Sequence, residues 1–174
     1  MIDQLYNDTI YSIGQPGQVE PKFFFEIRKN RMPAESYRRP ENLINYSADK
    51  ARYSRWVVTD RWIFLNGTYF NKVRNIVYDR KSTTCEYVPY LAGFHNALIE
   101  NDLDRGPPFW FKGSTFTGDL FNVIHPYKII EYNENGLLYR HTPKDKKAVS
   151  VFSKMKSELS ENDNPVIQII QLKN

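Results

Sequence analysis

The sequence predicts a mainly β protein built from several small antiparallel sheets, and three observations support this fold class. Aromatic residues make up 15% of the 174 residues, and aromatic and β-branched side chains favour the pleated surface of a sheet. Runs of these residues recur along the chain and are separated by short polar turns that contain Gly, Pro, Asp or Ser. Only one long segment, residues 142–159, has the periodicity of an amphipathic helix.

Four predicted strands follow one another closely in the middle of the chain. They cover residues 54–59, 61–70, 72–78 and 83–90 and are joined by short polar turns. Strands in such close succession are typical of an up-and-down meander, in which each strand pairs with the next. Further strands are predicted before and after this group, at residues 6–13, 21–27, 96–102 and 118–124.

The C-terminal third of the chain predicts two helices and a last strand. A short helix is expected at residues 126–132, and a longer one at 142–159, with Thr142 as its N-cap and Pro143 at its first position. The longer helix carries an apolar stripe that we expect to pack on a sheet: Ala148, Val151, Phe152, Met155 and Leu159. The last segment, 164–173, is apolar on both faces, which predicts an interior strand between stacked sheets.

Composition excludes some classes of protein and leaves others open. The net charge of +4 is modest, and the basic residues are spread along the chain, so nucleic-acid binding is not indicated by charge alone. Cys85 is the single cysteine, so the chain cannot form an internal disulfide, and we interpret this residue as a packing residue. The first residues lack the basic start and apolar stretch of a signal peptide. Taken literally, the chain is cytoplasmic, and the alternative is that it is a shortened relative of a longer protein.

Three segments of the chain resemble an uncharacterised six-bladed β-propeller family of Bacteroides-type bacteria. Residues 7–11 read Asn-Asp-Thr-Ile-Tyr and are similar to a strand that recurs in that family. Residues 101–104, followed by 106–110, resemble its Asn-Asp-(Ile/Leu)-Asp-Gly-Gly-x-Pro-Phe-Trp segment, with Arg105 where the family often has Gly. Residues 161–166 and the apolar strand after them resemble its closing segment.

The resemblance implies a truncated, half-propeller-like single domain over residues 1–174. Members of the family are usually about twice as long as this chain, carry an N-terminal export or lipoprotein signal, and have no assigned activity. The chain would supply about three blades, with one or two inserted helices, and two blade faces would need cover. We therefore expect self-association, pairing with the missing propeller half, or a sheet stack covered by the 142–159 helix. The full-length relatives would be exported or lipid-anchored at the cell envelope.

The loop around Asp102 is the best candidate for a ligand site, because it holds carboxylates and aromatic rings next to a Gly-Pro-Pro turn. The predicted ligand-binding residues are Asp102, Asp104, Phe109 and Trp110. In an extended segment Glu100, Asp102 and Asp104 would project from one face, where their oxygens could bind Ca²⁺. The alternatives are that the carboxylates shape the turn by accepting backbone N–H bonds and that the aromatic rings are core residues.

The leading functional hypothesis is a non-enzymatic binding or scaffold module, with a glycan or a peptide as its ligand and no cofactor other than Ca²⁺. One alternative is a glycan hydrolase or lyase that uses Asp102 and Asp104 as an acid–base pair. A second is nucleic-acid binding through the basic segment 28–55, where aromatic residues lie among the Arg and Lys residues. The sequence shows no zinc-type histidine pair, no glycine-rich phosphate loop and no apolar run that could span a bilayer.

Overall fold

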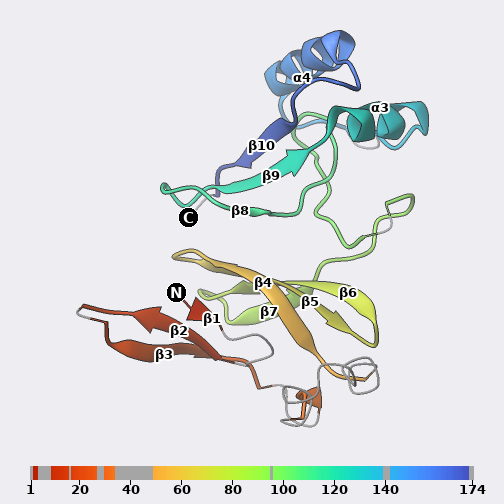
Figure 1. Cartoon of the computed structure of the whole chain (residues 1–174). Helices are drawn as coiled ribbons and strands as arrows, with labels where there is room; N and C mark the ends of the chain where they lie inside the picture. Colours follow the sequence, from red (N-terminus) through yellow and green to blue (C-terminus); the bar gives the residue numbers. More distant parts are fainter. Residues whose placement is uncertain are drawn as a thin grey trace. The chain divides into compact units, whose positions relative to one another are not determined.

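The computed structural model divides the chain into two units, Met1–Tyr87 and Val88–Asn174, each held together by its own internal contacts. It describes residues 2–3, 9–15, 17–26, 30–33, 49–94, 96–138 and 142–172. The predicted mainly β class with three antiparallel sheets is confirmed, and none of the sheets is closed (Figure 1). The expectation that residues 1–174 form a single domain stays a prediction.

The first unit begins with a three-stranded antiparallel sheet of order β1-β2-β3. Its strands are β1 (Ile2–Asp3), β2 (Thr9–Ile13) and β3 (Val19–Phe24). The turn between β2 and β3 is closed by a hydrogen bond from Gly14 N to Gln18 O, at 2.7 Å. Gly17 has a φ of 82° in this turn, in the left-handed region that glycine tolerates best.

The predicted meander forms the second sheet of this unit, with the strands in the order β4-β5-β6-β7 (Figure 1). Its strands are β4 (Arg52–Val58), β5 (Trp62–Tyr69), β6 (Lys72–Asp79) and β7 (Thr84–Tyr87). Because the connections are short, the nearest partner of each strand is the next strand along the chain. The spacing of the strands in the sequence was therefore enough to predict this topology.

One face of the β4–β7 sheet carries the core of the first unit. Ile63 and Leu65 are two residues apart on β5, so both project from this face. Ile76 on β6 is the pairing partner of Leu65 and belongs to the same cluster. All three side chains are buried, and Phe23 and Phe25 pack against them. Burial of side chains of this size contributes about 1.5–3 kcal/mol each, so this cluster stabilises both sheets of the unit.

The second unit contains a three-stranded antiparallel sheet of order β10-β9-β8 and two helices. The elements are β8 (Gly113–Ser114), β9 (Leu120–Ile124), α3 (Pro126–Glu134), α4 (Lys146–Glu158) and β10 (Val166–Ile170). The strand expected at residues 96–102 is wrong, because this segment makes only isolated bridges, Tyr90 with Ala97 and Ile99 with Phe109. The chain bends away after Ile99 because the side chain of Asn101 bonds to the backbone and closes a turn.

The prediction of an interior last strand is also wrong, because β10 is an edge strand of its sheet. Among the described strands it pairs with β9 alone. Ile167 and Ile169 are 64% and 58% exposed, whereas Val166 on the opposite face packs against the buried Ile129 and Phe152. An apolar pattern on both faces shows that a strand is suited to burial, but the tertiary structure decides whether a neighbour covers it.

The long helix begins later than predicted, with Asp145 as its N-cap in place of Thr142. Asp145 Oδ1 accepts hydrogen bonds from the backbone N–H groups of Lys147 and Ala148, at 2.9 and 3.0 Å. The backbone N–H groups of Lys144 and Asp145 bond to the carbonyls of Asp102 and Leu103. These bonds hold the preceding residues against the 101–108 loop, so helical geometry cannot start before Lys146.

We predict that Gly67→Ala destabilises the first unit by about 1–3 kcal/mol. Gly67 is buried on β5 beside a register shift in β4, and an added Cβ would lie 2.9 Å from Cδ1 of Tyr53 and against the Arg52 carbonyl. Urea unfolding of the variant measures this loss. The matched control is Gly14→Ala, whose Cβ would meet nothing nearer than 3.8 Å, and an equal loss in both variants would contradict the prediction.

Candidate functional site

The 101–108 loop of the second unit is held by the side chain of Asn101. Its Oδ1 accepts hydrogen bonds from the backbone N–H groups of Leu103 and Asp104, at 3.2 and 3.3 Å. Its Nδ2 donates to Asp104 Oδ1 at 2.7 Å and to the Pro107 carbonyl at 3.2 Å. One half-buried amide therefore satisfies four polar groups of a loop that has no regular secondary structure.

Asp102 and Asp104, two of the predicted ligand-binding residues, both make contacts that shape this loop. Asp104 Oδ1 accepts a hydrogen bond from the backbone N–H of Gly106, at 2.7 Å. Asp102 forms an ion pair with Lys144 through its Oδ2. The contact of Asp104 corresponds to the structural alternative, in which a carboxylate accepts a backbone N–H and orders the turn before Pro107. The contact of Asp102 is a side-chain ion pair. Ligand binding by Asp102 and Asp104 stays a prediction.

Arg105 has a φ of 66°, in the left-handed region that favours glycine. The sequence resemblance leads to the expectation of Gly at this position, and Gly would adopt this backbone conformation without strain. A non-glycine residue in this region costs about 1–2 kcal/mol. The hydrogen bonds of Asn101 and Asp104 on either side of the turn offset that cost by fixing the backbone.

The chain bends within the segment that carries the three carboxylates of the predicted Ca²⁺ site. Glu100, Asp102 and Asp104 would share a face only in a straight strand, and the chain turns at residues 103–105. Among the described residues, no group of three or more Asp, Glu, His or Cys side chains is arranged to hold a metal ion.

The aromatic residues that follow the loop are buried. Phe109, Trp110 and Phe111 are 2%, 9% and 1% exposed, as the packing alternative expected. A platform for stacking a sugar or a peptide needs exposed ring faces. Phe109 and Trp110 therefore have no exposed face that would support their predicted role as ligand-binding residues.

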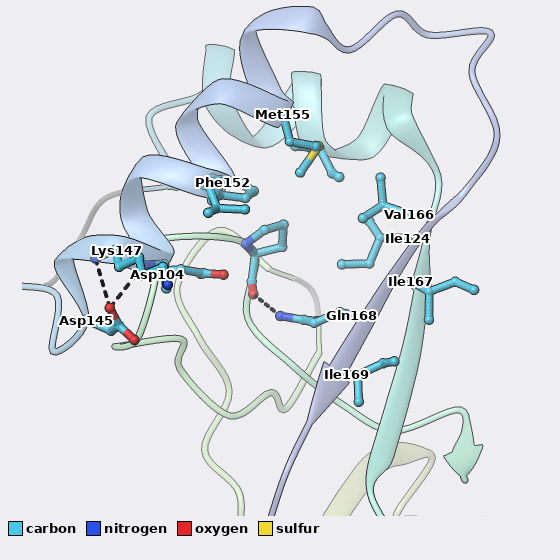
Figure 2. Close-up of a pocket in the computed structure, with 14 residues that line it drawn as sticks. Asp104, Ile124, Asp145, Lys147, Phe152, Met155, Val166, Ile167, Gln168 and Ile169 are labelled. Atoms are coloured by element: carbon cyan, nitrogen blue, oxygen red, sulfur yellow. Dashed lines mark hydrogen bonds between the residues drawn. The ribbon is translucent and has the colours of Figure 1, made fainter.

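A pocket of about 480 Å³ lies within the second unit, between α4 and β10 (Figure 2). Its volume falls within the range of about 300–1,000 Å³ that is usual for small-ligand sites. One wall is formed by α4, whose Val151 is 64% exposed and whose Phe152 is buried. The other wall is formed by β10. The apolar lining includes Ile124, Ile129, Val151, Phe152, Met155 and Val166.

The polar groups of this pocket gather at the end where α4 begins. Figure 2 shows Asp104 of the loop, Asp145 and Lys147 together at this end. Gln168 lies farther along β10 and donates through Nε2 to the Pro107 carbonyl at 3.1 Å. Of these residues the sequence singled out Asp104 alone as a site residue. The sequence gave no signal for Gln168, because its hydrogen bond to the Pro107 carbonyl joins residues that are 61 positions apart in the chain.

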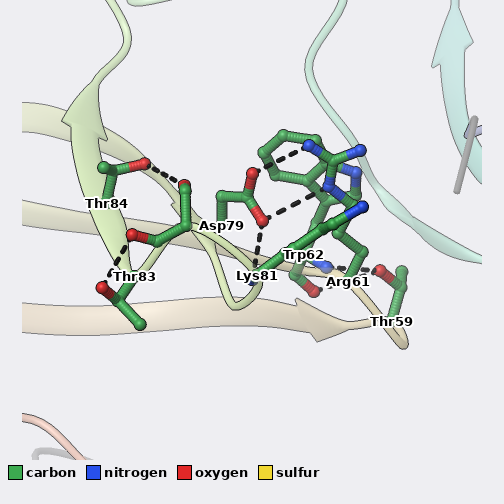
Figure 3. Close-up of polar contacts among 8 residues, drawn as sticks. Thr59, Arg61, Trp62, Asp79, Lys81, Thr83 and Thr84 are labelled. Atoms are coloured by element: carbon green, nitrogen blue, oxygen red, sulfur yellow. Dashed lines mark hydrogen bonds and ion pairs between the residues drawn. The ribbon is translucent and has the colours of Figure 1, made fainter.

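A second polar cluster, in the first unit, surrounds the turns at the ends of β5 and β6 (Figure 3). Arg61 donates from Nε and Nη2 to the two carboxylate oxygens of Asp79, at 3.3 and 2.9 Å. The Arg61 guanidinium also lies 4.5 Å from the centre of the Trp62 ring. The hydrogen bond from Arg61 holds the pKa of Asp79 well below its usual value, although burial of this carboxylate opposes the shift.

This Arg61–Asp79 cluster is explained by its structural role. Asp79 Oδ1 also accepts the backbone N–H of Lys81, at 2.9 Å, and Arg80 Nη1 bonds to the carbonyls of Thr59 and Asp60. These bonds tie together the turn between β4 and β5 and the turn after β6. Arg61 and Asp79 pair with each other, and the contacts of this cluster are those of ordered turns.

Cys85 and the basic segment 28–55 are two further features that the sequence analysis named. The interpretation of Cys85 as a packing residue is wrong, because its side chain is exposed on β7. Desolvation raises the pKa of the Cys85 thiol, and the neighbouring Glu86 adds to this effect, so little of the reactive thiolate forms at neutral pH. In the basic segment 28–55, which was considered for nucleic acid, residues 28–29 and 34–48 lie outside the described residues.

Comparison with known proteins places the chain in a family. Residues 1–171 match the family described as "Domain of unknown function (DUF4934)", and the chain belongs to it. Its fold is similar to that in the crystal structure of a Bacteroides fragilis protein described as a "Putative exported protein", with a TM-score of 0.65 and 16% sequence identity. The match covers 97% of this chain and 46% of that protein, so the chain spans less than half of its relative's length. No curated protein matches the chain.

We predict that Asn101→Ala destabilises the second unit by about 1–3 kcal/mol, because it leaves half-buried polar groups of the loop without partners. Thermal and urea unfolding measure the loss. The matched control is Asn96→Ala, whose side chain is exposed in the same unit and should change stability by less than about 0.5 kcal/mol. Equal effects in the two variants would show that the Asn101 hydrogen bonds do not hold the loop.

We predict that Asp79→Asn lowers stability at pH 7 and that this difference shrinks in acid. Because the pKa of Asp79 is lowered in the folded chain from its ordinary value of 3.8, its stabilising contribution is complete above that value and is lost as the pH falls below it. Urea unfolding at pH 7, 5 and 3 compares the wild type with the variant. Asp60→Asn, at a neighbouring exposed position, is the control, and a difference that does not change with pH would contradict the prediction.

Proposed function

We propose that this chain is a non-enzymatic binding module and that its ligand occupies the pocket between α4 and β10. The observation that carries this proposal is the pocket itself, a space of about 480 Å³ with apolar walls and with carboxylates at one end. An apolar cavity with a few polar groups that fix the orientation of a ligand is the usual form of a small-ligand site. The pocket lies within one unit of the chain.

We further propose that the fold derives from a six-bladed β-propeller, of which the chain supplies about three blades. Three separate antiparallel sheets, one of them a four-stranded meander, support this derivation. The similarity to a protein more than twice as long is consistent with it. Because that protein is described as exported, we propose the cell envelope or the exterior as the place where the full-length relatives act. Among the described residues, no helix has the length and apolar character needed to cross a bilayer.

The alternative of a glycan hydrolase or lyase receives less support from the contacts of the residues that it needs. In a glycan hydrolase or lyase, Asp102 and Asp104 would have to be available as acid and base. Asp102 is paired with Lys144, and Asp104 accepts hydrogen bonds from Asn101 and Gly106. These contacts favour a role in ordering the loop.

We predict that the chain binds the neutral dye Nile red at one saturable site and that Val151→Trp weakens this binding by about tenfold. Val151 lines the pocket but is 64% exposed, so a larger ring can enter the pocket without disturbing the buried core. Dye titration followed by fluorescence measures the affinity.

The matched control for this experiment is Lys154→Trp, which places the same ring on α4 at an exposed position outside the pocket. This variant should bind the dye as the wild type does. Absence of saturable binding to the wild type, or equal weakening in the two tryptophan variants, would refute the proposed site.

A further inference from the structure

The pocket follows the open edge of β10. Val166, Ile167, Gln168 and Ile169 all line it, although consecutive residues of a strand point to opposite faces of the sheet. A space that touches four consecutive residues must therefore run beside the strand. Figure 2 shows all four on one side of the pocket, with α4 on the other. Among the described strands, β10 has no neighbour on this side.

The edge of β10 has the chemical character of a site for another strand. An unpaired edge presents a row of backbone N–H and C=O groups that an extended polypeptide can pair with. The exposed side chains of Ile167, Ile169 and Val123, which is 36% exposed, add an apolar surface on the outer face of this sheet. A small apolar molecule would leave the backbone groups of the edge unpaired, whereas a strand would satisfy them.

The polar atoms at the end of the pocket indicate which charge the partner carries. The Oδ1 atoms of Asp104 and Asp145 are each occupied by two hydrogen bonds from the chain, and Gln168 and the Pro107 carbonyl are bonded to each other. Among the described residues, the Oδ2 atoms of Asp104 and Asp145 accept no hydrogen bond, and Lys147 forms no ion pair with either of them. The two carboxylates that remain outnumber the one ammonium group of Lys147 at this end, so they favour a cationic donor.

From these observations we infer that the ligand is an extended peptide segment that adds to the edge of β10. Its alternate side chains are apolar and enter the pocket, and a Lys or Arg at one end reaches Asp104 and Asp145. This inference rests on the proposed function, since it assigns a ligand class to the same pocket. Main-chain pairing supplies affinity in such complexes, and the side-chain pocket with its charged end supplies specificity.

Isothermal titration calorimetry with three synthetic peptides tests this inference directly. The first is a seven-residue peptide of alternating Val and Thr with a terminal Lys. The second ends in Glu in place of Lys, and the third has Pro in place of two central Thr residues. We expect the Lys peptide to bind about tenfold more tightly than the Glu peptide. We expect the Pro peptide not to bind, because proline removes the N–H groups that pair with an edge.

The double variant Asp104→Asn with Asp145→Asn tests the charged end of the site. Asn keeps an oxygen that can accept the structural hydrogen bonds and is as good an N-cap as Asp, so we expect the fold to be retained. The tenfold preference for the Lys peptide should be lost, so that the Lys and Glu peptides bind with about equal affinity, while the Pro peptide still fails to bind. The control Glu158→Gln, on α4 outside the pocket, should keep the full preference.

Other outcomes separate this inference from the proposed function. Binding of Nile red without binding of any peptide would leave the pocket as a ligand site and overturn the peptide assignment. Equal affinity for the three peptides would also overturn it. If light scattering shows a dimer that Ile169→Lys dissociates, the edge belongs to a second copy of the chain and the inference is wrong. The inference is supported if the chain is monomeric, binds the Lys peptide more tightly than the Glu peptide, and does not bind the Pro peptide.

Discussion

The unit that contains the pocket depends on the hydrogen bonds that Asn101 makes inside an irregular loop. The Pro107 carbonyl accepts hydrogen bonds both from Asn101 and from Gln168 on β10. The backbone carbonyls of the same loop accept hydrogen bonds from the two residues that precede α4. One loop thus anchors the strand and the start of the helix that form the two walls of the pocket, and the geometry of the site follows from it.

The carboxylates of this unit serve two purposes at once. Asp104 and Asp145 each use one oxygen to satisfy backbone or amide N–H groups of the chain. The second oxygen of each accepts no hydrogen bond from the described residues, and both residues line the end of the pocket. A carboxylate has enough acceptor positions for both tasks, and the hydrogen bonds to the chain fix the orientation in which the free oxygen is presented. A residue that orders a turn can therefore also contribute to a binding surface.

The exposed apolar edge of β10 distinguishes the second unit from the four-stranded sheet of the first. In the first unit the apolar face of the β4–β7 sheet is covered by Phe23 and Phe25. In the second unit Ile167 and Ile169 remain exposed on the strand that ends the sheet. Soluble proteins usually protect such an edge because it can pair with other chains. Its retention here is physically consistent with a surface that is covered when a partner binds.

The sequence alone determined the features that depend on neighbouring residues. The β4–β7 meander, the short α3 helix and the body of α4 follow from local periodicity and turn residues, and a turn ordered by Asp104 was one of the alternatives that the sequence offered. Only the tertiary structure decided that β10 lies at an edge, that α4 starts at Lys146, and that Gln168 meets Pro107. These features depend on contacts between residues far apart in the chain, and the local pattern of apolar and polar side chains carries no record of such contacts.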